Sequence, residues 1–397
     1  MLSETIAALK PSAIVEVFDH AIRLRAEGRE LIDFSVGEPD FDTPHHIRDA
    51  GIAAINSGVT RYTATDGTNA LKDAICRKFK RDNNLTFRHD EIVIGAGAKP
   101  LLAVAMQAVL NPQDEVIMTT PCWSSHPGMV EICAGVPVLV ETTIDNQFKM
   151  SAEQLDSAIT PRTRMLVLCS PSNPTGAVYS ADQLAAFADI LRRHPNILIL
   201  SDDLYEHIVF DDNRFATLAA IAPDLGDRIL TINGVSKAYA MTGWRIGFGG
   251  GPKWWMDGIR AIFSQSNGGP CSISQAAAEA ALDGPQELLS EWRAVYQNRR
   301  DLAVERINRI DGLTAISPEG AFYLMPHCGG LIGRKRPDGW VISNSTDLAA
   351  WFLEQGLVVV PGAGFQCDPY FRMSIATSEA EIAKGLDLMA DACERLN

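Results

Sequence analysis

The chain has 397 residues, of which 46% are hydrophobic and 21% are charged, and this ordinary globular usage argues against a disordered or fibrous protein. Its 35 basic and 49 acidic side chains give a formal net charge of -14, and without a strong basic cluster that charge disfavours binding to nucleic acid. Because one hydrophobic core stops growing well below this length, we expect two domains.

The N-terminal segment mixes charges with short apolar stretches, so it matches neither a signal peptide nor a membrane span. We therefore expect a cytoplasmic protein with no membrane partner. Up to about residue 44 the segment has no core of its own, and we expect it to pack on the second domain. The eight cysteines show no CxxC pair and no metal-like spacing to histidines, which favours reduced, buried thiols and no metal site.

Short apolar runs alternate with longer helical patterns from about residue 90 to residue 250. The runs cover residues 92–94, 116–118, 165–168, 197–200 and 229–232. Such alternation indicates stacked βαβ units, and so a mainly parallel sheet flanked by helices.

The pattern changes after about residue 284 to a long polar helix, predicted over residues 286–309, which is followed by Gly- and Pro-punctuated strands and a C-terminal helix from residue 379. We therefore predict an α/β protein. Its large domain covers residues 45–285, and a smaller α+β domain combines residues 1–44 with 286–397.

A polar or Gly- and Pro-rich cluster follows each apolar run of the predicted sheet. The clusters are residues 95–99, 120–123, 170–176, 201–205 and 233–237. Because the carboxyl ends of parallel strands meet at one edge of a sheet, we expect a single site built from these five loops.

Lys237 follows the last run, where a lysine can be a surface charge, a phosphate contact, a buried ion-pair partner or a nucleophile that forms a Schiff base. Asp202 lies at the end of the preceding predicted strand, and a carboxylate there can keep the ring nitrogen of a pyridine-aldehyde cofactor protonated. Tyr205 and Asn173 can both hydrogen-bond the ring hydroxyl of such a cofactor. Each residue alone has an ordinary structural explanation, and only their combination indicates a cofactor site.

The Gly-rich turn at residues 95–98 precedes an apolar helix, expected over about residues 100–110, so its backbone N–H groups can bind a phosphate. It has neither P-loop spacing nor the order of a dinucleotide site. Ser236 and Arg245 can complete the phosphate site, and Trp123 can stack on a ring.

Two further residues have open interpretations. Arg372 follows an extended run of the second domain, where its planar guanidinium can bind a substrate carboxylate or simply lie at the surface. His126 can hydrogen-bond Asp202 or lie in a surface loop.

In order and spacing these residues resemble the fold-type I, pyridoxal-phosphate-dependent class I/II aminotransferases, particularly their bacterial aspartate (aspartate/prephenate) branch, from about residue 10 to residue 377. The resemblance implies the fold of those transferases, pyridoxal 5'-phosphate as cofactor, and Lys237 as the catalytic lysine that carries it. The cofactor contacts that it implies are Tyr62, Gly97, Ala98, Trp123, Asn173, Asp202, Tyr205, Ser236 and Arg245.

The resemblance also implies that Arg372 and the backbone near Gly37 hold the substrate's α-carboxylate. Since Tyr62 matches a tyrosine that reaches the neighbouring subunit's cofactor, it implies a homodimer with shared active sites. Lys99 matches a lysine that binds a distal carboxylate, and Ser12 matches a second polar contact. We therefore expect amino transfer between aspartate, or another dicarboxylic amino acid, and a 2-oxo acid such as 2-oxoglutarate.

Alternatives remain open at this stage. Ile14 and the pair at residues 268–269 depart from the family pattern and widen the distal pocket, which leaves room for aromatic or neutral amino acids or for prephenate. A carbon–sulfur β-lyase would use the same cofactor groups. A cofactor-sensing regulator with a fused DNA-binding module is disfavoured, because the resemblance begins near residue 10 and the net charge is negative.

Overall fold

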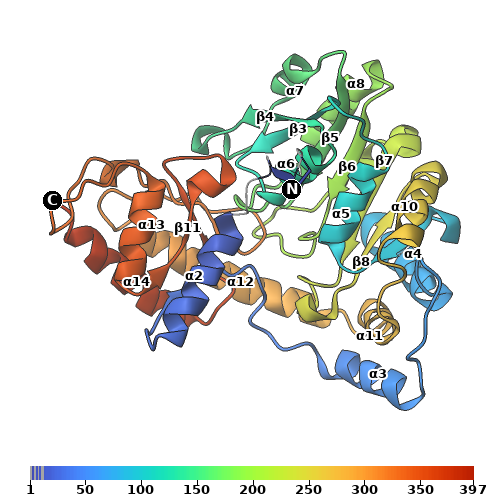
Figure 1. Ribbon diagram of the computed structural model, residues 1–397, viewed down its shortest axis with the longest axis horizontal. Helices are drawn as coiled ribbons and strands as arrows, with labels where there is room; N and C mark the ends of the chain where they lie inside the picture. The colour runs from blue at the N-terminus through green and yellow to red at the C-terminus, as the bar shows by residue number, and fades with distance from the viewer. Residues whose placement is uncertain (1, 4–5, 8, 10–12) are drawn as a thin grey trace.

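The computed structural model describes residues 2–3, 6–7, 9 and 13–397. A seven-stranded sheet lies at the centre of the larger half of the molecule (Figure 1), with strand order β2-β8-β7-β6-β5-β3-β4. Its strands are β2 Ile92–Gly95, β3 Glu115–Thr120, β4 Val136–Glu141, β5 Thr163–Cys169, β6 Leu198–Asp202, β7 Ile229–Gly234 and β8 Gly247–Gly250.

The mainly parallel sheet that the sequence predicts is confirmed, and all five predicted runs are strands. Strand β8 alone runs antiparallel to its two neighbours, β2 and β7. The sequence Gly247-Phe248-Gly249-Gly250 contains one large apolar side chain, so it gives no strand signal, and neither β8 nor the edge strand β4 was expected.

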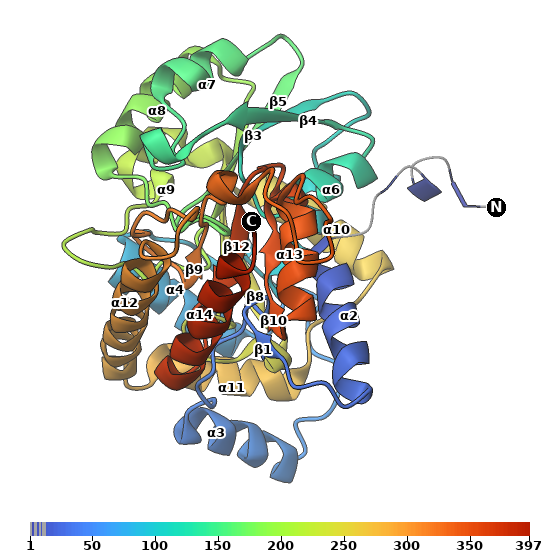
Figure 2. The same cartoon turned by 90° about the vertical axis from the view of Figure 1, so that its left-hand side faces the viewer.

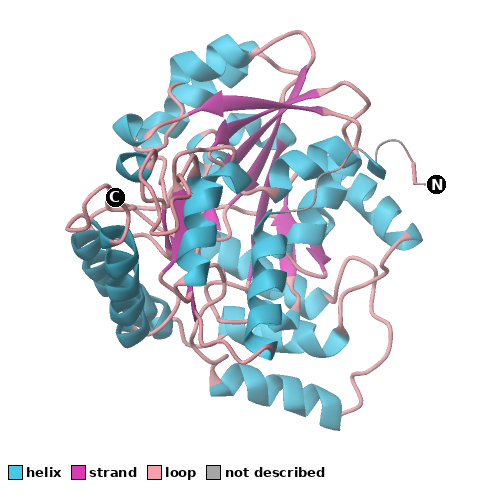
Figure 3. Cartoon of the chain, turned by 60° about the vertical axis from the view of Figure 1, so that its left-hand side comes forward, coloured by secondary structure: helices cyan, strands magenta, loops and turns pink. Residues whose placement is uncertain are grey.

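Helices cover both faces of the sheet because its strands are apolar on both sides (Figure 3). Along β2, Ile92 and Ile94 contribute to the core on one face, and Val93 to the core on the other. The first face carries α3 His45–Asn56, α4 Asn69–Asn83, α7 Ala152–Ala158, α8 Ala181–Arg193, α9 Leu218–Ile221 and α11 Ser272–Asp283. The second carries α5 Ala98–Gln107, α6 Ser125–Ile132 and α10 Lys253–Gln265.

The second core lies beside the first and is built from both ends of the chain (Figure 2). The N-terminal segment joins it through a parallel pairing of Ile32 with Leu357, and Phe34 is fully buried there. Its elements are α2 Ala13–Ala26, β1 Ile32–Asp33, α12 Glu287–Ile307, β9 Tyr323–Leu324, α13 Ser345–Glu354, β10 Leu357–Val358, β11 Val360–Pro361, β12 Phe371–Ser374 and α14 Glu379–Glu394.

Short 3-10 turns connect several of these elements. They are η1 His89–Glu91, η2 Ile144–Asn146, η3 Pro223–Arg228, η4 Thr242–Trp244, η5 Gly329–Leu331 and η6 Gly362–Phe365. Among the described residues, no helix combines the length and the apolar character needed to cross a membrane. The domain boundaries near residues 45 and 285 stay a prediction.

Candidate active site

A cavity of about 280 Å³ lies between the carboxyl ends of the parallel strands and the second core. All five predicted loops contribute to its wall, and so do two side chains of the second core. The lining residues are Gly37, Ala98, Lys99, Leu102, Trp123, Cys169, Asn173, Asp202, Leu204, Tyr205, Ser236, Lys237, Thr242, Arg245, Tyr323 and Arg372.

Lys237 lies three residues beyond the end of β7, where its ammonium donates a hydrogen bond of 2.6 Å to the carbonyl of Gly37. Burial lowers the pKa of Lys237 to about 8, and the charges of Arg372 and Arg245 act in the same direction, while Glu38 opposes them. The amine is therefore partly unprotonated near neutral pH, which is the state that can act as a nucleophile or a base.

Asp202 is the last residue of β6 and is 4% exposed. Only one of its two carboxylate oxygens has a hydrogen-bond partner among the described residues. His126 lies 3.2 Å from its Oδ2 atom, so the expected contact between the two residues is confirmed. Its Oδ1 atom is buried without a hydrogen-bond partner among the described residues. Because burial without a partner is costly and Asp202 lines the cavity, this oxygen is suited to accept a hydrogen bond from a bound molecule.

The turn between β2 and α5 places backbone N–H groups against a guanidinium. Gly97 precedes the first turn of α5 with φ of 102°, and a side chain there would collide with Arg245. Arg245 donates to the carbonyl of Thr242 at 3.0 Å and is otherwise exposed. The helix N-terminus, Ser236 and Arg245 thus share one end of the cavity, and an anion is the ligand that they fit.

Arg372, in β12, is 1% exposed and also lines the cavity. Its guanidinium donates to the side-chain oxygen of Asn173 at 3.1 Å and to the carbonyl of Ser35 at 2.5 Å. It forms no ion pair with a carboxylate anywhere in the described part of the chain, and its Nε atom has no partner there. The surface interpretation of Arg372 is therefore wrong.

Lys99 occupies the first turn of α5, and its ammonium lies 5.2 Å from the ring centroid of Trp123. Burial and the nearby charge of Arg245 lower its pKa. Within the described residues it forms no ion pair, so the cavity has a second cation whose charge no carboxylate balances.

Tyr323 is a lining residue that the sequence analysis missed. Its hydroxyl lies 2.9 Å from that of Tyr205, and its ring lies 4.5 Å from the guanidinium of Arg372. It comes from β9, a two-residue strand with no pattern of its own, and only the antiparallel pairing of β9 with β12 brings it into the cavity.

Two of the predicted contacts, Gly97 and Tyr62, are not among the residues that line this cavity. Tyr62 is fully exposed and lies outside the lining. Ser12 falls outside the described residues, and the same holds for the side chain of Ile14.

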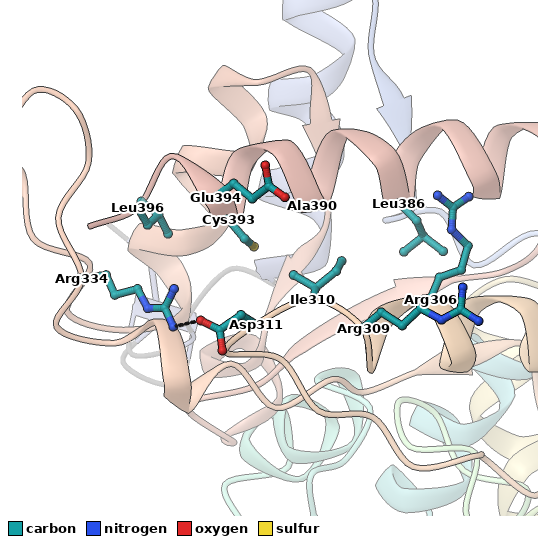
Figure 4. A pocket seen from close by; sticks show the side chains of 10 residues that line it. All are labelled: Arg306, Arg309, Ile310, Asp311, Arg334, Leu386, Ala390, Cys393, Glu394 and Leu396. Atoms are coloured by element: carbon teal, nitrogen blue, oxygen red, sulfur yellow. Dashed lines mark hydrogen bonds and ion pairs between the residues drawn. The ribbon is translucent and has the colours of Figure 1, made fainter.

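A second cavity, of about 480 Å³, lies in the second domain between α12 and α14 (Figure 4). Three arginines line it, and each already has a carboxylate partner: Arg306 pairs with Asp387, Arg309 with Glu305, and Arg334 with Asp311 at 2.6 Å. Since its cations are already paired, this larger cavity lacks the unbalanced charge of the first.

Comparison with known proteins gives a consistent answer. Residues 29–388 match the family described as Aminotransferase class I and II. An aspartate aminotransferase of Rhizobium meliloti (strain 1021) is 49% identical over 393 residues, which cover 99% of this chain and 96% of the relative. An aspartate/prephenate aminotransferase of Cereibacter sphaeroides is 48% identical over 396 residues, covering 100% of this chain and 97% of the relative.

Solved structures agree with the sequence matches. The crystal structure of the aspartate aminotransferase from Rhizobium meliloti has a TM-score of 0.97 at 48% identity, with 100% of both chains covered. The aspartate aminotransferase from Thermus thermophilus with maleate has a TM-score of 0.92 at 38% identity, with 99% of both chains covered. The predicted transferase fold and activity are confirmed: the chain belongs to the class I and II aminotransferases, and it is a transaminase that acts on small-molecule amino acids and oxo acids.

Proposed function

We propose that this transaminase carries pyridoxal 5'-phosphate on Lys237 and moves an amino group between aspartate, or another dicarboxylic amino acid, and a 2-oxo acid such as 2-oxoglutarate. One observation supports this most strongly: the cavity that holds the reactive Lys237 also holds Arg372, a buried cation with no carboxylate partner among the described residues. Burying an unpaired charge is costly unless a ligand balances it.

The cavity fits the cofactor at three points. The unpartnered Oδ1 atom of Asp202 suits a protonated pyridine nitrogen. The anion-binding end at Gly97, Ser236 and Arg245 suits the phosphate. The remaining predicted contacts, the ring of Trp123 and the polar atoms of Asn173, Tyr205 and Ala98, line the space between these ends.

Once bound, the cofactor supplies an electron sink that stabilises negative charge at the α-carbon of the substrate. The amino group of the substrate would first take the place of the Lys237 amine on the cofactor. The freed Nζ atom of Lys237 then moves the α-proton, since its lowered pKa leaves part of the amine unprotonated. Asp202 holds the ring nitrogen protonated, and His126 keeps the carboxylate of Asp202 in place from the far side. Because amino acid and oxo acid occupy the same cavity in turn, we expect ping-pong kinetics.

In this proposal two cations each bind one carboxylate of the substrate. Arg372, with the backbone of Gly37, binds the α-carboxylate through its paired N–H groups. Lys99 binds the distal carboxylate, and its unbalanced charge in the wall of the cavity supports a dicarboxylate. The related Thermus thermophilus enzyme was solved with maleate, which is itself a dicarboxylate. The predicted second contact, Ser12, lies outside the described residues.

We also propose a homodimer in which Tyr62 reaches the cofactor phosphate of the partner subunit. Ile52, Ile55, Val59 and Tyr62 all carry exposed large apolar side chains along α3 and the segment after it. A row of such side chains is typical of a protein interface. The division into a large domain, residues 45–285, and a small domain, residues 1–44 with 286–397, belongs to the same proposal. It is supported by the two main cores, of which the second also takes in Tyr205, Ile208 and Phe210 of the large domain.

A matrix of amino donors against oxo-acid acceptors tests this function. The donors are aspartate, glutamate, alanine, phenylalanine and a β-chlorinated alanine, and the acceptors are 2-oxoglutarate, pyruvate and prephenate, with each amino product quantified by mass spectrometry. We expect the highest kcat/KM for pairs in which both members are dicarboxylates. Release of pyruvate and ammonia from the chlorinated donor, without transfer to any acceptor, would instead establish the β-lyase alternative.

A further inference from the structure

The hydrogen bond between Tyr205 and Tyr323 links the loop after β6 to strand β9 in the wall of the cavity, where both rings pack in the second core. Tyr205 follows β6 of the large sheet, whereas Tyr323 belongs to β9 of the second core, and their hydroxyl oxygens lie 2.9 Å apart. The two residues are only 5% and 1% exposed, although both also line the cavity. As the two groups stand, either hydroxyl can be the donor.

We propose that Tyr323 is a positioning residue that donates its proton to the oxygen of Tyr205, so that Tyr205 donates its own proton to the ring oxygen of the cofactor. This inference rests on the proposed function, because it requires the cofactor beside Tyr205. A phenol has a single proton. If Tyr205 directs that proton to the cofactor, the bond between the two tyrosines exists only when Tyr323 is its donor.

The surroundings of Tyr323 favour the role of donor. The guanidinium of Arg372 lies 4.5 Å from the centroid of its ring, and a cation at the face of a phenol draws electron density from the hydroxyl. Chains of hydrogen bonds also polarise one another in a medium of low dielectric constant. A proton donated by Tyr323 therefore makes the hydroxyl of Tyr205 a stronger donor towards the cofactor.

Packing places the hydroxyl of Tyr323 where this bond requires it. A side chain at position 37 would collide with the hydroxyl of Tyr323, so glycine at that position allows the close approach. Phe322 packs edge-on against Tyr205 with ring centroids 5.4 Å apart and restricts the movement of the Tyr205 ring. Tyr323 thus touches both Arg372, the proposed carboxylate ligand, and Tyr205, the proposed cofactor ligand.

The substitution Tyr323→Phe tests this role because it removes the hydroxyl and keeps the ring. The measurement is a pH titration of the absorbance band of the bound cofactor in the holoenzyme. A hydrogen bond donated to the ring oxygen weakens its hold on the proton shared with the nitrogen that joins Lys237 to the cofactor. Losing Tyr323's contribution should therefore raise the pKa of this absorbance change, by roughly half a unit to one unit.

Tyr296→Phe is the matched control. Tyr296 is buried in the same aromatic cluster, 5.4 Å from Phe322 between ring centroids, but its hydroxyl has no hydrogen-bond partner among the described residues. The same chemical change at this position should leave the absorbance pKa at the wild-type value. An equal shift in both variants would mean that general loosening of the second core causes it, and would overturn the inference.

A double-mutant cycle distinguishes this inference from the proposed function. Tyr205→Phe should give a larger rise, and adding Tyr323→Phe to it should cause no further change, because Tyr323 acts through Tyr205. An additive shift, or a shift in Tyr205→Phe without one in Tyr323→Phe, contradicts the inference alone. A wild-type protein that binds no pyridoxal 5'-phosphate contradicts the proposed function itself.

Should Tyr323→Phe fail to hold the cofactor, Gly37→Ala provides a second test. The added methyl group displaces the Tyr323 hydroxyl from Tyr205 without removing it, so the absorbance pKa should again rise. An unchanged pKa in Gly37→Ala would then overturn the proposal.

Discussion

The cavity at the strand ends and the cavity between α12 and α14 both contain arginine side chains, but only in the second are all of these arginines paired with carboxylates. In the cavity between α12 and α14, each guanidinium is paired with a carboxylate of the same domain. In the cavity at the strand ends, Arg372 and Lys99 have no carboxylate partner within the described residues. The paired cavity is the larger, about 480 Å³ against about 280 Å³. Unbalanced charge, and not volume, therefore marks the site.

Replacing Lys237 should have the largest effect in the molecule. We expect Lys237→Ala to lower kcat for amino transfer by about a thousand-fold or more, because both the cofactor attachment and the proton-moving group are lost. Steady-state kinetics with aspartate and 2-oxoglutarate measure this. Circular dichroism should show an unchanged fold, and a loss of less than tenfold would contradict the assignment of Lys237.

Arg372→Lys, compared with Arg334→Lys, tests the contrast between the cavities directly. Both changes keep a positive charge and remove the forked geometry of the guanidinium. In the active-site cavity we expect kcat/KM to fall by roughly a hundred-fold for every amino donor, since each has an α-carboxylate. In the paired cavity kcat/KM should stay within about twofold of wild type, and equal losses at both positions would remove the distinction.

The lowered pKa of Lys237 also predicts how stability depends on pH in the cofactor-free protein. Below pH 8 the folded protein carries a buried ammonium group at Lys237, and burial disfavours the charged form. Lys237→Met should therefore raise the free energy of unfolding by about 2–3 kcal/mol. Between pH 8 and the lysine's ordinary pKa of about 10.4, the folded wild type loses its proton before the unfolded chain does, so the cost of burying the charge falls. The higher free energy of unfolding of Lys237→Met relative to wild type should therefore disappear over this range. Urea unfolding at pH 7 and pH 10 measures the difference, and a constant gap would contradict the pKa shift.

Lys99→Ala should have a smaller and more selective effect. If Lys99 binds a distal carboxylate, the KM for aspartate and 2-oxoglutarate should rise by about tenfold or more, whereas alanine as donor should be almost unaffected. Parallel assays with aspartate and alanine measure this selectivity. Equal losses for the two donors would show that Lys99 supports the cavity in general.

The smallest effect belongs to the paired cavity. Arg334→Ala removes an ion pair whose partner Asp311 has 89% of its side chain exposed, so the free energy of unfolding should fall by only about 0–1 kcal/mol. Chemical denaturation measures this change. A loss above about 3 kcal/mol is the size expected for a buried ion pair, and it would contradict the contrast drawn between the two cavities.

Local sequence was sufficient for the predicted strands and for the loops at their ends. The alternation of Ile92, Val93 and Ile94 between two faces follows from the two-residue period of a strand, and helices then have to cover both faces. Asp202, Ser236 and Lys237 could be placed in one site because they lie at or just beyond the carboxyl ends of parallel strands. Strand β8 could not be predicted, since its glycines carry no apolar pattern.

The sequence by itself thus determined five strands of the sheet and the loops at their ends, including the loop that carries Lys237, because these depend on periodicity and on short separations along the chain. Only the tertiary structure decided that Arg372 is buried without a carboxylate and that Tyr323 lies against Tyr205, residues that are 118 positions apart. Such facts depend on which segments, far apart along the chain, pack against one another in the folded molecule. Hydrogen-bond pairing, burial and charge balance depend on these tertiary contacts, and no local pattern along the chain predicts them.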